Sequence, residues 1–171
     1  MTDANKPSRL AQAYHGMLTR IKEFVDEAEG EFAPKIQYAI DSAKEKATEL
    51  GELTREEAEH VGQYLQRDLQ DAASYLDTEG KELADWLKFD AELVEDRLLD
   101  VFSHAINTTS IELAQLSTQA KQENLWYMGE VSGPGTFVCD NCQHEISFYH
   151  IQDIPACPKC GEGVFRRITS E

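Results

Sequence analysis

The first fifty residues carry apolar side chains at steps of three and four, which is the spacing of one face of an α-helix. The stripe consists of Leu10, Tyr14, Met17, Ile21, Phe24, Ala28, Phe32, Ile36, Ile40, Ala43, Ala47 and Leu50. Gly30 and Pro34 lie within it, and a proline ring crowds the carbonyl four residues before it. The pattern therefore predicts a helix over about residues 8–50 that is bent at this point, or two helices with a short break.

A stop signal and a start signal for helices follow directly. Gly51 favours the C-terminal end of the first helix. Thr54 and Glu57 form a capping box, in which each side chain bonds the backbone N–H of the other residue. These signals predict a tight helical hairpin.

The next stretch repeats every eleven residues. The fourth positions of the repeat hold Val61, Ala72, Leu83 and Val94, and the eighth positions hold Leu65, Leu76, Leu87 and Leu98. Eleven residues make about three turns, so the apolar stripe stays almost straight along one helix. A helix over about residues 55–105 would be about 75 Å long. The aromatic row at the seventh positions, Tyr64, Tyr75 and Trp86, is expected to widen the buried stripe, with a partner-binding ridge as the alternative.

A third, shorter helix is expected over about residues 110–123, where Thr109 and Glu112 can cap it. The predicted fold is therefore mainly α: an acidic helical arm over residues 8–124, built as a long antiparallel hairpin or coiled coil, followed by a small β unit over residues 125–171. Since the arm has its own stripe and caps, we expect it to be elongated and to fold without the β unit.

Two CxxC pairs organise the β unit and contain every cysteine of the chain. They are Cys139-Asp140-Asn141-Cys142 and Cys157-Pro158-Lys159-Cys160, with β-prone residues on both sides and an outer strand that begins at Trp126. Two such loops facing each other supply the tetrahedral sulfur shell that zinc favours. We predict a zinc ribbon with one structural zinc per chain, bound by Cys139, Cys142, Cys157 and Cys160.

Two alternatives compete with zinc. Two disulfides are disfavoured because no signal peptide precedes the chain, which predicts a cytoplasmic protein with reduced thiols. Iron is the stronger alternative, because Cys-Pro-x-Cys-Gly is also the second knuckle of rubredoxins. Zinc is favoured because Gln143 stands where the first knuckle would carry the matching glycine. With four cysteines present, His144 and His150 are expected to have surface roles.

Charge narrows the class of partner. Residues 1–130 carry a net charge of −14, and residues 131–171 carry −2. Such a field repels nucleic acid and anionic membranes and favours basic protein partners. The only basic residues of the ribbon are Lys159, Arg166 and Arg167, so direct nucleic-acid binding is disfavoured. No stretch approaches the ~18 apolar residues of a membrane span. The helical arm also offers a surface for self-association.

The sequence carries no common catalytic signature, which predicts a protein that is not an enzyme. A P-loop, a nucleophile elbow, an HExxH motif and a glycine-rich dinucleotide turn are all missing. A rubrerythrin-like di-iron centre needs two Glu-x-x-His motifs on facing helices, and the chain has one, from Glu57 to His60.

The layout of acidic helices followed by Gly-Pro-Gly-Thr-Phe-Val-Cys139-x-x-Cys142 and Cys157-Pro158-x-Cys160-Gly161 resembles the YbeL-like family of bacterial zinc-ribbon proteins. The resemblance implies a helical N-terminal region, a C-terminal zinc ribbon and the four cysteines as ligands, but no activity. The favoured function is a metal-stabilised protein-interaction module, such as a regulator or adaptor. The alternatives are a protein that docks on the transcription or translation machinery through its ribbon, and a rubredoxin-like electron carrier.

Overall fold

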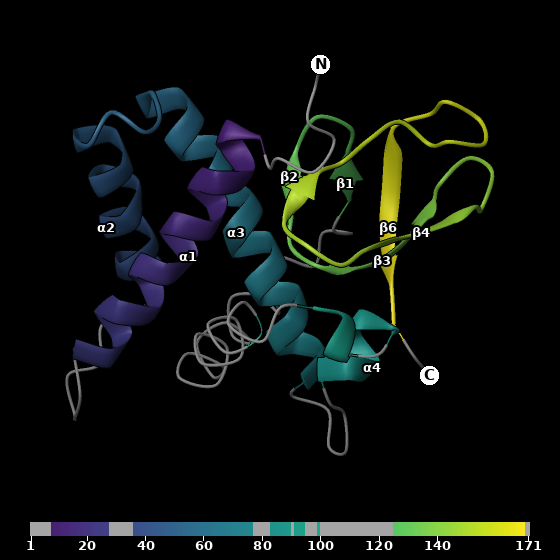
Figure 1. The fold of residues 1–171 in the computed structure, drawn as a ribbon, viewed down its shortest axis with the longest axis horizontal. Helices are drawn as coiled ribbons and strands as arrows, with labels where there is room; N and C mark the ends of the chain where they lie inside the picture. Colours follow the sequence, from purple (N-terminus) through teal and green to yellow (C-terminus); the bar gives the residue numbers. More distant parts are fainter. Residues whose placement is uncertain are drawn as a thin grey trace.

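The computed structural model describes residues 8–27, 36–76, 83–89, 91–94, 99 and 125–169. Within these residues the helices are α1 (Arg9–Glu27), α2 (Ile36–Glu49), α3 (Arg55–Leu76) and α4 (Leu83–Leu87), with a 3₁₀ turn η1 (Ala91–Leu93). The first three helices pack against one another and form a helical layer beside the strands, as Figure 1 shows.

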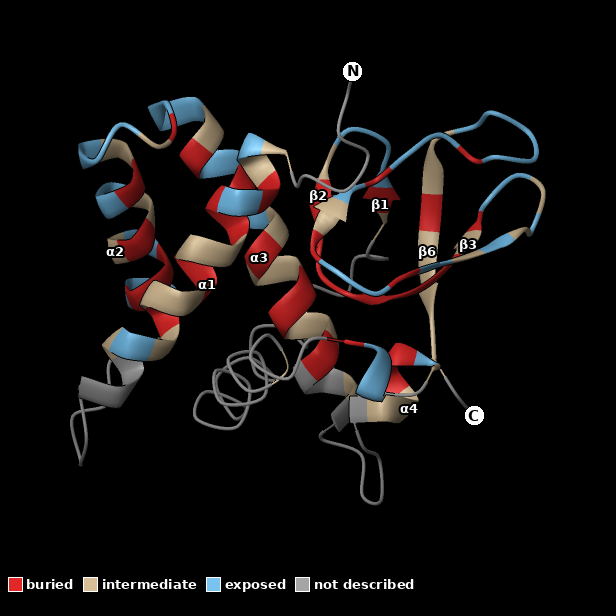
Figure 2. Ribbon diagram, viewed as in Figure 1, coloured by how far each residue is buried: buried red, intermediate tan, exposed pale blue. Residues whose placement is uncertain are grey.

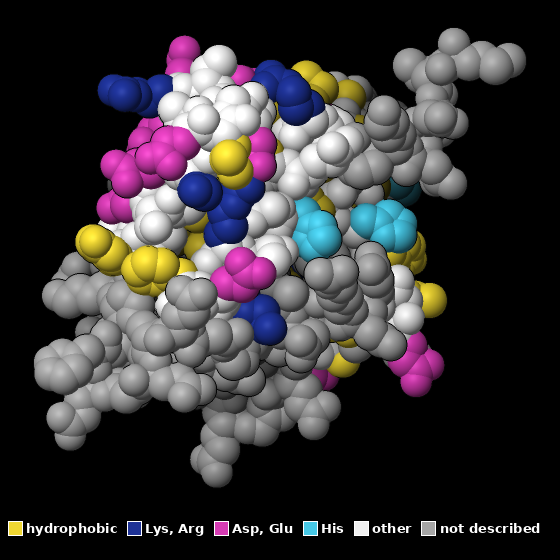
Figure 3. Space-filling view, turned by 60° about the vertical axis from the view of Figure 1, so that its left-hand side comes forward, with side chains coloured by type: hydrophobic (Ala, Val, Ile, Leu, Met, Phe, Trp, Pro, Cys, Tyr) yellow, Lys and Arg dark blue, Asp and Glu magenta, His cyan; other side chains and the backbone are white. Residues whose placement is uncertain are grey.

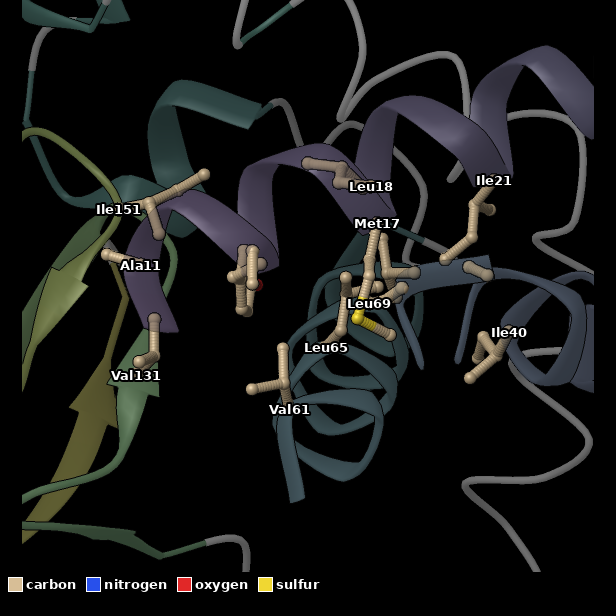
Figure 4. Packing of buried hydrophobic residues seen from close by; sticks show 14 of the residues in the cluster. Ala11, Met17, Leu18, Ile21, Ile40, Val61, Leu65, Leu69, Val131 and Ile151 are labelled. Carbon is tan, nitrogen blue, oxygen red and sulfur yellow. The ribbon is translucent and has the colours of Figure 1, made fainter. Parts of the chain in front are cut away.

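The predicted apolar stripes form the core of this helical layer. The buried side chains include Tyr14, Met17, Leu18 and Ile21 of α1, Ile40, Ala43 and Ala47 of α2, and Val61, Leu65, Leu69 and Ala72 of α3. Several of them point toward one another between the helices (Figure 4). Leu50, the last member of the first stripe, is 56% exposed because it follows the end of α2.

The stripe of the first fifty residues belongs to two helices that lie side by side. The ring centroids of Phe24 in α1 and Tyr38 in α2 are 5.8 Å apart. Residues fourteen positions apart in one continuous helix would be about 21 Å apart. The chain therefore reverses direction between α1 and α2, which matches the predicted break and not a single bent helix; Gly30 and Pro34 themselves lie outside the described residues.

The predicted hairpin between α2 and α3 is confirmed. Gly51 has a positive φ of 71°, a conformation that glycine adopts without steric cost. The Glu57 N–H donates to Thr54 Oγ1 at 3.1 Å, and the Thr54 N–H donates to Glu57 Oε1 at 3.0 Å. Both bonds of the capping box are therefore present at the start of α3.

The contribution of this cap to stability can be measured. We expect Thr54→Ala to lower the free energy of unfolding by about 1 kcal/mol, the usual effect of removing a threonine N-cap. Thr48→Ala is the matched control, because the Thr48 hydroxyl donates to the Lys44 carbonyl within α2 and does not cap a helix. Urea unfolding would measure both variants, and an equal loss in the two would mean that the Thr54 cap contributes nothing of its own.

The prediction of one continuous helix over residues 55–105 is wrong. Lys88 has a φ of 61°, which no right-handed helix contains, so α4 ends at Leu87. The Thr136 hydroxyl donates to the Leu87 carbonyl at 2.7 Å, and the Trp86 indole donates to Asp71 at 2.9 Å. These bonds draw α4 onto α3 and onto the β region in place of a straight continuation. The described helices therefore do not show a long coiled coil, and the predicted helix over residues 110–123 lies outside the described residues.

The β region consists of two antiparallel sheets. The larger has the strand order β1-β6-β3-β4, and the smaller pairs β2 with β5. Their bounds are β1 (Trp126–Tyr127), β2 (Val131–Ser132), β3 (Gly135–Cys139), β4 (Glu145–Phe148), β5 (Gln152–Asp153) and β6 (Val164–Ile168). As predicted, the outer strand begins at Trp126, which pairs with Phe165 of β6.

We call residues 125–169 the ribbon. Its own core includes Trp126, Phe137, Cys139, Phe148, Ile154, Cys157 and Phe165. Val131 of β2 and Ile151, in contrast, belong to the core of the helical layer, and β2 contacts both α1 and α3. Figure 2 accordingly shows buried segments both in the helices and in the strands beside them.

This shared core bears on the predicted domain division. The boundary between residues 124 and 125 falls at the edge of the described residues, and the division itself stays a prediction. The contacts, however, do not indicate an arm that is independent of the ribbon, because strand residues complete the core between α1 and α3. None of the described helices is long and apolar enough to cross a membrane.

Candidate metal centre

The structure brings the four cysteine sulfurs together. All four lie within 4.8 Å of one another, and the closest pairs, Cys139–Cys160 and Cys142–Cys157, are 3.6 Å apart. Four zinc–sulfur bonds of about 2.3 Å in a tetrahedron place the sulfurs about 3.8 Å apart. A disulfide needs about 2.05 Å, and all four thiols are free. The donor set therefore fits one metal ion, and the alternative of two disulfides does not match the structure.

The two CxxC segments fold into matching turns. In the first, the Gln143 N–H donates to the Cys139 carbonyl at 2.9 Å, and in the second the Gly161 N–H donates to the Cys157 carbonyl at 2.8 Å. Each turn curls its two sulfurs inward. The turns face each other because Cys139 ends β3 and pairs with Phe165 of the neighbouring strand β6.

Both turns end on a residue with a left-handed backbone. Gln143 has a φ of 64° and Gly161 has a φ of 83°. Glycine adopts this conformation freely, whereas a residue with a Cβ pays about 1–2 kcal/mol. The absence of a glycine after the first CxxC pair therefore changes the strain of the turn but not its shape.

This difference predicts opposite effects of two substitutions. Gly161→Ala is expected to destabilise the ribbon by about 1 kcal/mol, and Gln143→Gly to be neutral or slightly stabilising. Nothing in the described structure lies within 4 Å of a Cβ added at Gly161, so the effect would report the backbone alone. Thermal unfolding of the metal-loaded protein measures both, and a more stable Gly161→Ala variant would contradict the left-handed conformation.

The four thiols are not electrostatically equivalent. Burial raises the pKa of Cys142 to about 12. The Asn141 side chain and the Glu162 backbone hold the pKa of Cys160 at about 6. Burial opposes ionisation of Cys157, but backbone N–H groups of its turn lower its pKa on balance. A metal ion that takes all four sulfurs must displace the proton of Cys142, so metal binding weakens as the pH falls.

Other candidate ligands named from the sequence do not join this cluster. The sulfur cluster is made of cysteines alone among the residues that the structure describes, and His144 and His150 lie partly or fully exposed outside it. The Glu57 carboxylate is held by Arg9 and by the capping box. His60 is exposed and lies beside Tyr64, with ring centroids 6.4 Å apart.

A buried carboxylate that sequence reasoning missed lies where the helical layer meets the ribbon. Asp68 of α3 is 0% exposed and accepts hydrogen bonds from Tyr14 at 2.7 Å, Trp126 at 2.9 Å, the Gly133 N–H at 3.0 Å and Arg67 at 3.2 Å. Burial, and then the charge of Asp68, raise the pKa of Tyr14 well above its usual value. Two of the four donors belong to the ribbon, so Asp68 links it to the helices.

The sequence does contain a signal for this role. Val61, Leu65 and Ala72 mark the buried face of α3, and Asp68 falls on the same face at helical spacing. A carboxylate in phase with an apolar stripe is buried, and a buried carboxylate needs hydrogen-bond donors.

Arg167 of β6 forms a second buried connection between the ribbon and the helices. The sequence contains no comparable signal for it. Its guanidinium lies 3.8 Å from the centroid of the Trp86 ring and donates to the Pro134 carbonyl at 2.9 Å. Burial lowers its pKa, and Asp71 lies 3.3 Å from its Nε. A Cβ at Gly135 would collide with this guanidinium, so a larger residue there would require the buried guanidinium to move. Trp86 thus belongs to the buried core of the helical layer, as expected for the aromatic row, and it also packs on Arg167 of the ribbon.

Comparisons with known proteins agree with the site. A family described as "Zinc-ribbon containing domain" matches residues 23–169. Proteins called "Uncharacterized protein YbeL" from Escherichia coli K12 and Escherichia coli O157:H7 are each 25% identical over 160 residues, which is 94% of this chain and 96% of theirs. No solved structure matches the chain. The resemblance drawn from the cysteine motif is thereby confirmed, and the match includes all four cysteines as well as α2 and α3.

Proposed function

Because the chain belongs to the family with a zinc-ribbon containing domain, we propose that it is a non-enzymatic protein-interaction module whose ribbon is held folded by one structural zinc ion. Cys139, Cys142, Cys157 and Cys160 would hold the ion. Its chemistry there is to join two turns that have no covalent link.

One observation carries the proposal: four free thiols lie within 4.8 Å of one another. Among the described residues, no other metal-binding group belongs to this cluster. Four thiolates complete the coordination of zinc, which leaves no position for a water or a substrate. A closed shell of this kind favours a structural role over a catalytic one. The ribbon is also too small to be stabilised by its apolar core alone, so metal binding would supply folding free energy.

The interaction role is supported by charge and by the absence of a catalytic motif. The chain has a net charge of −16, which favours a basic protein partner over nucleic acid. Reduced thiols persist in the cytoplasm, and we place the protein there. The regulator or adaptor role would follow from binding a partner at the acidic helical layer, with the zinc maintaining the fold.

Elemental analysis tests the metal assignment directly. Protein expressed without added metal is expected to contain one zinc per chain, and the zinc should be lost on acidification as the thiolates become protonated. Near-stoichiometric iron, with visible colour that dithionite bleaches, would overturn the assignment and support the rubredoxin-like electron carrier.

A further inference from the structure

A groove of about 320 Å³ lies between α1 and α2. Phe24 of α1 and Ala39 and Ala43 of α2 contribute its apolar lining. Phe24 also packs against Tyr38, which is 64% exposed. An exposed aromatic ring beside a partly exposed one is an anchor for the apolar side of a ligand.

The charged groups around this groove are unbalanced. Arg20 is already neutralised by Glu52, with two hydrogen bonds at 2.9 and 2.5 Å, and these bonds raise the pKa of Arg20. The remaining charged groups of the lining are the ammonium of Lys46 and the carboxylates of Glu23, Glu45 and Glu49.

Glu45 and Glu49 are the two lining carboxylates that a bound cation would stabilise most. They lie four residues apart on α2, where like charges repel each other. Neither has an ion-pair partner among the residues that the structure describes. A cation placed between them would remove this repulsion and gain two charge-assisted contacts. Figure 3 brings the α2 side of the molecule forward and shows acidic, basic and apolar side chains on this face.

We propose that this groove docks a lysine- or arginine-rich amphipathic helix of a partner protein. The inference rests on the proposed interaction function and names its surface. The apolar side of the partner helix covers Phe24 and Tyr38, and one of its basic side chains lies between Glu45 and Glu49. This is the usual mode in which an amphipathic helix binds a groove between two helices.

Charge argues against the other occupants. A second copy of this chain also carries a net charge of −16 and meets the groove with the same sign. Nucleic acid and anionic membranes are repelled for the same reason. A basic helix is the occupant whose charge complements the rim.

The test uses the zinc-loaded full chain and a fluorescein-labelled helical peptide of leucine and lysine, with leucine at helical spacing. Its twin carries glutamate in place of every lysine. Fluorescence anisotropy at about 0.15 M salt, where surface charges are screened beyond about 8 Å, measures both. We expect saturable binding of the lysine peptide and none of the glutamate peptide.

Two variants locate the binding site. Glu45→Gln with Glu49→Gln removes the paired carboxylates, and Ser42→Trp fills the groove from a half-buried position in its lining. Each is expected to weaken binding about tenfold, as expected for the loss of two partly exposed charge contacts or of the apolar seat. The matched control is Glu56→Gln with Glu59→Gln, which removes the same charge from the first turns of α3.

The inference is overturned if the control pair weakens binding as much as the groove pair, because binding would then follow net charge alone. It is also overturned if the zinc-loaded protein does not bind the lysine peptide, or if the glutamate peptide binds equally well. Zinc content measured on the same sample separates the two proposals: a stoichiometric zinc with no peptide binding rejects the groove alone, and a chain without zinc rejects the structural zinc site.

Discussion

Replacement of Cys142 by alanine is expected to unfold the ribbon and to destabilise the helical layer with it. Three thiolates cannot complete the shell, and a structural zinc contributes on the order of 10 kcal/mol at neutral pH. That is comparable to the whole net stability of a single domain, which is about 5–15 kcal/mol. On the same sample, metal analysis would measure the loss of zinc, circular dichroism the loss of helical signal, and thermal unfolding the loss of stability.

The helical layer is affected because the ribbon completes it. Val131 and Ile151 belong to its core, and Trp126 and the Gly133 N–H donate to the buried Asp68. Unfolding of the ribbon removes these contacts and leaves a carboxylate with fewer donors. We therefore expect loss of helical signal and a lower unfolding temperature.

His144→Ala is the matched control, since His144 lies in the turn after Cys142 and its side chain is outside the sulfur cluster. It should retain both the metal and the helical signal. If Cys142→Ala lost the metal while the helical signal stayed unchanged, the helical layer would fold alone, as the sequence suggests, and the shared core would not stabilise it.

Asp68→Ala is expected to lower the free energy of unfolding by about 3–5 kcal/mol, the usual cost of removing one partner from a buried charged network. The substitution leaves the buried donors of Tyr14 and Trp126, at 2.7 and 2.9 Å from the carboxylate, without an acceptor. It also removes a partner from Arg67, whose side chain is 12% exposed. Denaturant unfolding followed by tryptophan fluorescence and by circular dichroism measures the change.

The two tryptophans make this experiment informative, because Trp86 lies in α4 and Trp126 in β1. Coincident transitions of fluorescence and helical signal would indicate one cooperative unit. Asp41→Ala is the control: Asp41 is an exposed carboxylate paired with Lys44, and such a pair contributes about 0–1 kcal/mol. A loss at Asp68 no larger than at Asp41 would contradict the role given to the buried carboxylate.

Features that depend on neighbouring residues were predictable from the sequence. The capping box involves two residues three positions apart, and the apolar stripes follow from helical spacing. The same holds for the sulfur cluster: each CxxC pair is a local turn, and two pairs in one small unit have few ways to satisfy four thiols. The four cysteines of the metal site are therefore predictable from the sequence without knowledge of the packing.

The error at α4 has a different origin. The eleven-residue repeat correctly marks Trp86, Leu87 and Val94 as buried. A hydrophobic period states that a face is covered, but it does not identify what covers it. Here the face packs into the core of the helical layer and against the guanidinium of Arg167 in β6. The Thr136 hydroxyl of β3 donates to the Leu87 carbonyl, where the helix ends.

The sequence by itself determined the helical stripes of α1, α2 and α3, the start of α3 and the four cysteines of the candidate metal centre, because these depend on spacings of a few residues and on the chemistry of the side chains. Only the tertiary structure decided which surfaces meet. The hydrogen bonds of Asp68 to Tyr14 and to Gly133 join residues 54 and 65 positions apart. Contacts over such separations are selected by the burial of the whole core and not by any local pattern, and they make the helices and the ribbon parts of one fold.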